Sequence, residues 1–198
     1  MTKLNVMTPI AYAGERYSVI VDGHGFYGML RAVGWHVDFK RVLDLGRPGR
    51  RIEALYFTPL DEENADEHNP VIPLIDFLGY NGWGITTKDF TNDSRLQSGR
   101  RRPSLVPEMS VALCRAADYV DRFILFSGDP ELEPAINYVQ ARGKPVTIVG
   151  AVEQGLVADG LRRAAFDVRE LNSPAMRHFL EKTRPAPDGA SIPLVSSA

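Results

Sequence analysis

Cysteine is nearly absent from this chain, which holds Cys114 and no other. A single cysteine cannot form a disulfide within the chain. The four histidines are scattered, and no Cys/His spacing suits a zinc site. We therefore expect neither internal disulfides nor a structural zinc ion.

Long hydrophobic runs are also missing. No apolar stretch approaches the roughly 18 residues that a membrane-spanning helix needs. The N-terminus has no basic leader followed by an apolar segment of signal-peptide length. We expect a cytoplasmic protein with no membrane partner.

A strong excess of charge of one sign is a third absence. The formal net charge is −2, so a polyanion would have to be held by a local basic patch rather than by the field of the whole molecule. Apolar residues make up 44% and charged residues 24%, which is typical of an ordinary globular protein. The length favours one domain over residues 1–183. Residues 184–198, rich in proline, alanine and serine, are expected to be a disordered tail.

Strand-like and helix-like segments alternate along the chain. This order predicts an α/β protein with a mostly parallel sheet covered on both faces. The strands are expected at residues 17–22, 51–58, 83–88, 121–127 and 145–149. The helices are expected at residues 26–34, 39–45, 69–78, 105–118, 131–141, 152–163 and 173–183.

Carboxylates follow two of the expected strands. Asp22 ends the first strand, and Asp129 and Glu131 come directly after the fourth. In open α/β sheets, functional groups gather beyond the carboxyl ends of parallel strands, where the strand order reverses. Clustered carboxylates favour a hard cation such as Mg²⁺ or Mn²⁺, which can promote phosphodiester hydrolysis. The sequence therefore predicts one shared acidic site with one of these metals.

A glycine-rich motif offers an alternative. Residues 23–28 read Gly-His-Gly-Phe-Tyr-Gly and match the G-x-G-x-x-G pattern of dinucleotide-binding proteins. Asp22 immediately before it would set a negative charge beside the pyrophosphate. The second strand also lacks the acid that would bind a ribose hydroxyl. We interpret the glycines as a tight turn that presents Asp22, and we expect no dinucleotide cofactor.

Four segments resemble the PIN-like NYN domain family, also called LabA-like. They are residues 19–23 (Val-Ile-Val-Asp-Gly), 39–43 (Phe-Lys-Arg-Val-Leu), 123–134, which contain Ser-Gly-Asp-Pro-Glu, and 139–150, which contain Arg-Gly-Lys-Pro. The resemblance extends over about residues 17–150. It implies a three-layer α/β/α sandwich, a Mg²⁺ or Mn²⁺ site, and endoribonuclease activity that leaves a 5′-phosphate.

The resemblance also implies roles for single residues. Asp22 and Asp129 match two metal ligands, and Glu108 is the candidate for the acid that the family places at the start of its third helix. Glu131 stands where the family commonly has aspartate, and would support catalysis from beside the metal. Glu108 also fits an ordinary first-turn acid favoured by the helix dipole, and the sequence leaves both interpretations open.

Two departures from the family pattern suggest another function. Gly25 replaces the usual asparagine, and Ala112 and Cys114 lie where a further helix acid often stands. The alternative is therefore a catalytically weakened domain that binds RNA, a protein partner or a second copy of itself.

Basic residues near the expected site could contact RNA. Lys88 ends the third expected strand, and a cluster before the next helix contains Arg95, Arg100, Arg101 and Arg102. Neighbouring Lys and Arg contacts to phosphates contribute a large, salt-dependent share of affinity. A solvated loop is the equally simple interpretation of the cluster. Another basic cluster, at residues 47–51, is expected at the opposite edge of the sheet.

Overall fold

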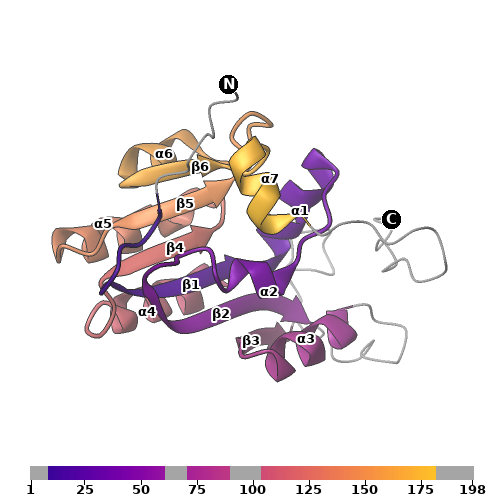
Figure 1. The fold of residues 1–198 in the computed structure, drawn as a ribbon, viewed down its shortest axis with the longest axis horizontal. Helices are drawn as coiled ribbons and strands as arrows, with labels where there is room; N and C mark the ends of the chain where they lie inside the picture. The colour runs from indigo at the N-terminus through magenta and orange to yellow at the C-terminus, as the bar shows by residue number, and fades with distance from the viewer. Residues whose placement is uncertain (1–8, 61–70, 90–103, 182–198) are drawn as a thin grey trace.

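A parallel sheet of six strands forms the centre of the computed structural model, which describes residues 9–60, 71–89 and 104–181 (Figure 1). The strands lie in the order β3-β2-β1-β4-β5-β6, and each pairs in parallel with its neighbours. Their bounds are β1 Arg16–Asp22, β2 Arg50–Leu60, β3 Gly84–Asp89, β4 Arg122–Phe126, β5 Val146–Gly150 and β6 Asp167–Glu170.

Helices cover both faces of this sheet. α4 and α5 pack together on one face, while α2 and α7 pack together on the other, in front of the sheet in Figure 1. The helices are α1 Gly23–Val33, α2 Phe39–Val42, α3 Val71–Tyr80, α4 Val106–Ala116, α5 Glu133–Ala141, α6 Asp159–Ala164 and α7 Pro174–Leu180, with a 3₁₀ turn, η1, at Pro130–Leu132. The predicted three-layer α/β/α architecture is confirmed.

The central strands are buried on both faces. Every residue of β4 and β5 is buried, as are the five inner residues of β1. Helices on both faces of a parallel sheet require such continuous apolar strands rather than alternating ones. This is why short apolar runs in the sequence were sufficient to predict these strands.

Helix α1 begins at Gly23, earlier than the expected start at Phe26. Asp22 caps its N-terminus, and Gly34 ends it with a φ of 73°, the left-handed conformation that glycine adopts without strain. Phe26 packs against Phe126 of β4 with ring centroids 4.8 Å apart. This contact fixes the first turn of α1 against the strand that leads to Ser127.

The order of the strands reverses between β1 and β4. Their register pairs Tyr17 with Arg122 and Val21 with Phe126. From β1 the chain moves outward through β2 to β3, and from β4 it moves outward through β5 to β6. Both strands end at the same edge of the sheet, and this is the point where ligands of open α/β sheets bind.

The C-terminal third differs from the prediction. Residues 152–163 were expected to form one helix, but only Asp159–Ala164 is helical, and residues 151–158 form turns that pack against Gly128. Strand β6 was not predicted, and the expected helix at 131–141 divides into η1 and α5. Some expected segments lie outside the described residues, among them the start of the helix at 69–78, the end of the helix at 173–183 and the tail at 184–198.

None of the helices in residues 9–60, 71–89 and 104–181 combines the length and the apolar character that crossing a bilayer requires.

Candidate functional site

Asp22 stands at the junction of β1 and α1. Its Oδ1 accepts a hydrogen bond from the backbone N–H of Gly25 at 3.0 Å, which caps the helix. Its Oδ2 accepts a hydrogen bond from Ser127 Oγ at 3.1 Å. Both carboxylate oxygens are thus oriented by the protein, and each retains a lone pair for another partner.

Asp129 follows β4 and caps the 3₁₀ turn η1. Its Oδ1 accepts the backbone N–H of Glu131 at 2.9 Å. Its own backbone N–H donates to Ser127 Oγ at 3.2 Å. The side chain of Asp129 is half-buried, while that of Glu131 is exposed.

Ser127 connects the two strand ends. Its hydroxyl is fully buried, donates to Asp22 and accepts from Asp129. One hydroxyl group therefore ties the end of β1 to the turn after β4. The structure brings Asp22 and Asp129 to one site, as expected from their positions after neighbouring parallel strands.

The electrostatics of the pair favour a cation. Burial raises the pKa of Asp22 above its ordinary value, and nearby Asp129 raises it further. Hydrogen bonds from Gly25 and Ser127, together with His24, act in the opposite direction without reversing the shift. The ionised pair is thus held together at an energetic cost, which a positive charge between the carboxylates would offset.

Glu108 lies in the first turn of α4. There it forms an ion pair with Lys88 and does not join Asp22 and Asp129. Lys88 Nζ and Glu108 Oε1 are 2.8 Å apart, and Lys88 also donates to the backbone oxygen of Ser104. Burial would raise the pKa of Glu108, but the hydrogen bond from Lys88, a backbone hydrogen bond and the charge of Lys88 together outweigh burial, and the pKa is lowered. Oε2 of Glu108 is shielded from solvent and has no hydrogen-bond partner among the described residues.

The chemistry of these donors fits a hydrated Mg²⁺ or Mn²⁺ ion. Mg²⁺ keeps several waters and is commonly bound through one or two carboxylates together with substrate phosphates. Asp22 and Asp129 supply such a pair, and the unpartnered Oε2 of Glu108 is a further oxygen donor. Within the described part of the chain, no three or more His, Cys, Asp or Glu side chains gather closely enough to hold an ion. The observed site is therefore a pair of acids with Glu108 held apart.

The basic residues that were predicted to contact RNA lie in different places. Lys88 is at the end of β3 and is paired with Glu108. Arg95, Arg100, Arg101 and Arg102 lie outside the described residues. The cluster at residues 47–51 precedes and begins β2, so it lies at the opposite edge of the sheet, as expected.

Beside the acidic pair, the loop after β5 closes over the turn after β4. Ala158 N–H donates to the backbone oxygen of Gly128 at 3.2 Å. A Cβ atom at Gly128 would collide with the backbone oxygen of Leu156. Gly128 is therefore required where these two loops meet, immediately before Asp129.

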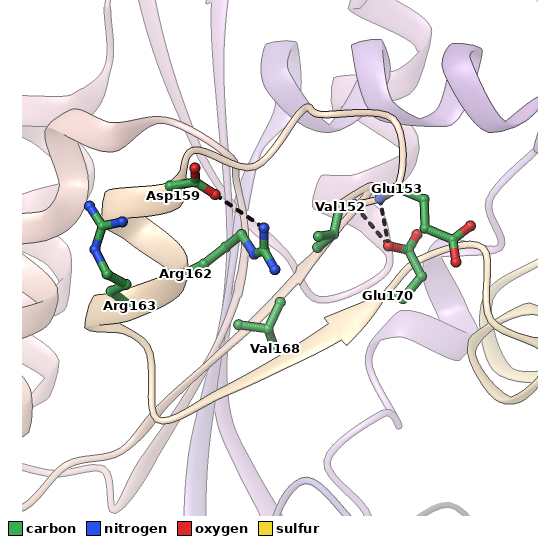
Figure 2. Close-up of a pocket in the computed structure, with 7 residues that line it drawn as sticks. All are labelled: Val152, Glu153, Asp159, Arg162, Arg163, Val168 and Glu170. Atoms are coloured by element: carbon green, nitrogen blue, oxygen red, sulfur yellow. Dashed lines mark hydrogen bonds and ion pairs between the residues drawn. The ribbon is translucent and has the colours of Figure 1, made fainter.

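The outer side of the same loop borders a cavity of about 670 Å³ (Figure 2). Figure 2 shows Arg162 of α6 paired with Asp159 on one side of it. On the other side, Glu170 accepts the backbone N–H groups of Val152 and Glu153. None of the residues predicted for the site lines this cavity, and several of its charges are satisfied within the protein.

Sequence reasoning assigned no role to two residues of the site. Ser127 was recognised only as part of a motif, although a serine directly after a buried strand is positioned to bond the neighbouring strand end. Tyr56 of β2 reaches the start of α1, where a Cβ atom at Gly23 would lie 2.6 Å from its hydroxyl oxygen. Burial, and secondarily the charge of Asp22, raise the pKa of Tyr56, so its hydroxyl stays protonated.

Comparisons with known proteins agree with this architecture. A model of the NYN domain family matches residues 16–172. The low amplitude and bright protein LabA of Synechococcus elongatus is 28% identical over 192 residues, which cover 96% of this chain and 100% of that protein. A crystal structure of a Vibrio parahaemolyticus protein of unknown function has a TM-score of 0.68 at 19% identity, and covers 84% of this chain and 96% of that one. The last similarity supports the fold alone.

Proposed function

Because this chain belongs to the NYN domain family, we propose that it is an endoribonuclease that uses Mg²⁺ or Mn²⁺ held by Asp22 and Asp129. One observation carries the proposal above all others. The two acids are tied through the Ser127 hydroxyl at the point where the strand order reverses. Ligands of open α/β proteins bind at this point.

The proposed reaction is hydrolysis of an RNA phosphodiester bond. Water adds to phosphorus, the bond to O3′ breaks and O3′ takes up a proton, which leaves a 5′-phosphate and a 3′-hydroxyl. A divalent cation bound here would lower the pKa of a water molecule and polarise a phosphoryl oxygen. Asp22 and Asp129 would hold that cation through the lone pairs that Gly25, Ser127 and Glu131 leave unused.

Glu131 and Glu108 have supporting roles in this proposal. Glu131 is exposed in the first turn of η1, beside Asp129, and can accept a hydrogen bond from a metal-bound water or from the RNA. Glu108 stands apart from the two acids in an ion pair with Lys88, so it would have to approach them to offer its unpartnered Oε2 as the third ligand.

The proposed RNA path runs along the carboxyl edge of the sheet. Lys88 lies at that edge, and Arg95, Arg100, Arg101 and Arg102 are the further phosphate contacts we propose. Single-stranded RNA is the substrate that we propose to test first.

The test is Mn²⁺-dependent cleavage of a labelled single-stranded RNA. Wild type should cleave, and Asp22→Asn and Asp129→Asn should each lose at least about 100-fold in rate, since each removes a charged metal ligand. Asp118→Asn is a matched control, because Asp118 is an exposed acid paired with Arg142 away from the site. Equal cleavage by all four preparations would mean that a contaminating nuclease is responsible and would refute the proposal.

The second candidate is a catalytically weakened RNA-binding or protein-interaction domain. The ion pair between Lys88 and Glu108 favours it, because it leaves two acids at the site where three were expected. In that case wild type and Asp129→Asn would bind the RNA equally well, and neither would cleave it with Mn²⁺ or Mg²⁺.

A further inference from the structure

An open cavity of about 560 Å³ lies where β1 and β2 begin, at the edge of the sheet opposite the acidic pair. The chain returns to this edge from α2 through the loop at residues 43–49 (Figure 1). The residues that line this arginine pocket are Tyr17, Leu43, Asp44, Arg47, Pro48, Gly49, Arg50 and Arg51. At about 3.3 Å per residue, the length of β1 places the pocket roughly 20 Å from Asp22. The arginine pocket is therefore separate from the proposed ribonuclease site.

The loop that carries the arginines is packed closely against the sheet. The hydroxyl group of Tyr17 donates a hydrogen bond to the backbone oxygen of Leu43 at 2.9 Å. A Cβ atom at Gly46 would lie 2.6 Å from the fully buried ring of Tyr17. A Cβ atom at Gly49 would lie 3.0 Å from the backbone oxygen of Glu15. Because the loop has no room for side chains at these two positions, its backbone is a fixed platform for the arginines.

Two of the three guanidinium groups are oriented by hydrogen bonds within the protein. Nη1 of Arg51 donates to the backbone oxygen of Leu43 at 3.0 Å. Nε of Arg47 donates to Oδ1 of Asp44 at 3.0 Å. Burial raises the pKa of Tyr17, and the charges of Arg51 and Arg47 act against that shift, so both guanidinium groups lie near one ring. Each of them keeps further N–H donors for a ligand.

The arginine pocket holds more positive charge than the surrounding protein neutralises. Among the described residues that line it, Asp44 is the only acid against three arginines, a formal excess of two positive charges. Arg50 forms no ion pair within the described part of the chain. It pairs in register with Arg16 of β1, whose guanidinium is bound to Asp121. Like charges on neighbouring strands are destabilising, and such local conflicts are typical of functional sites.

We propose that the arginine pocket binds the phosphate group of a small phosphate monoester, such as a nucleoside monophosphate. Arginine binds phosphate oxygens through paired N–H donors. A phosphate monoester carries about two negative charges at pH 7, which matches the excess positive charge of the pocket. The cavity volume falls within the range of about 300–1,000 Å³ found for small-molecule sites.

The lining favours such a ligand over a strand of RNA. Proteins that bind single-stranded RNA offer aromatic side chains on which the bases stack. The aromatic residue of the arginine pocket, Tyr17, is 1% exposed and presents no ring face to a base. Each phosphodiester of RNA also carries less charge than a monoester, so it would neutralise the pocket less completely.

Calorimetric titration with adenosine 5′-monophosphate (AMP) in EDTA tests the proposal without engaging the metal site. Wild type should bind AMP saturably, inorganic phosphate should compete with it, and adenosine should not bind. Arg47→Met and Arg51→Met should each weaken AMP binding at least about 10-fold, since each removes charged hydrogen-bond donors. Arg142→Met is the matched control, because Arg142 is paired with Asp118 and does not line the pocket. It should bind AMP as wild type does.

Arg47→Met separates a loss of binding from a loss of folding, because the Arg47 side chain is 72% exposed and the melting temperature should not change. Absence of saturable AMP binding by wild type, or wild-type affinity in both Arg47→Met and Arg51→Met, would overturn the proposal. Adenosine binding as tightly as AMP would do the same. An oligoribonucleotide without terminal phosphates that bound more tightly than AMP, and lost affinity in both variants, would show an RNA contact instead.

The result is independent of the proposed ribonuclease activity. Asp129→Asn should bind AMP with wild-type affinity, because Asp129 follows β4 at the other edge of the sheet. A protein that bound AMP in this way and cleaved no RNA would support the arginine pocket and refute the ribonuclease. Weaker AMP binding by Asp129→Asn would place the ligand at the acidic pair and overturn the present proposal.

Discussion

Lys88 at the end of β3 forms an ion pair with Glu108 in the first turn of α4, with 2.8 Å between Nζ and Oε1. The sequence suggested separate roles for the two residues, one as a phosphate contact and the other as a metal ligand. Their pairing means that each neutralises the other unless RNA or a cation separates them. If Lys88 bound an RNA phosphate, Glu108 would therefore lose its partner and be available to a metal ion.

Lys88→Met should change how stability depends on pH. In wild type the lowered pKa of Glu108 contributes stability that is complete above its ordinary value of 4.5 and is lost as pH falls through the lowered pKa. Without Lys88, burial raises the pKa of Glu108 and only a backbone hydrogen bond still lowers it, so this contribution should shrink or reverse. At pH 7 the loss should be below about 1 kcal/mol, because the pair is partly exposed. Urea unfolding across this pH range measures the difference. If the free energy of unfolding changed with pH in the same way in both proteins, the effect of Lys88 on Glu108 would be contradicted.

Asp22→Asn should also change how stability depends on pH, but with the sign opposite to that of Lys88→Met. Because the pKa of Asp22 is raised, the folded state takes up a proton more readily than the unfolded state. Relative to Asp22→Asn, wild type should gain stability as pH falls from neutral through the raised pKa toward the ordinary value of 3.8. Asparagine keeps a capping oxygen for Gly25 N–H, so the helix cap is preserved. Chemical denaturation of both proteins tests this, and a constant stability difference between neutral and acidic pH would exclude it.

Mn²⁺ should stabilise wild type but not Asp129→Asn. At a free concentration 100 times the dissociation constant, ligand binding adds about 2.7 kcal/mol, or roughly 5–10 °C in melting temperature for a domain of this size. Without metal, Asp129→Asn should be at least as stable as wild type, since it relieves repulsion from Asp22 and can still cap η1. Thermal unfolding with and without Mn²⁺ measures both effects. If metal-free Asp129→Asn melted clearly lower than wild type, repulsion between Asp22 and Asp129 would be contradicted.

Gly128→Ala should disturb the junction of the two loops beside Asp129. The added Cβ atom would collide with the backbone oxygen of Leu156, which cannot rotate away as a side chain could. We expect a loss of about 1–3 kcal/mol in the free energy of unfolding, as in other overpacked sites. Gly79→Ala is the control, because a Cβ atom at that helical position meets nothing within 4 Å. Equal stability of the two variants would show that the loop after β5 does not depend on Gly128.

Most of the sheet could be predicted from the sequence, because buried parallel strands appear as short apolar runs. Strand β6 could not, since its four residues, Asp167–Glu170, include one apolar side chain, Val168, and are too few for a pattern. It forms through backbone pairing with β5 at the sheet edge, and such pairing leaves little trace in the sequence. The helix expected at 152–163 was wrong in its first half for a related reason. Residues 151–158 are held by contacts with Gly128, which is distant in the chain.

For the site, the sequence by itself determined that Asp22 and Asp129 would stand directly after buried strands, since local runs of apolar residues fix where a strand ends. Only the tertiary structure decided which groups those acids meet. The register of β1 against β4 brings Ser127 to Asp22, and the tertiary fold places Glu108 of α4 within ion-pair distance of Lys88 at the end of β3. Such pairings depend on distances between segments far apart in the chain, and these distances are set only when the core packs.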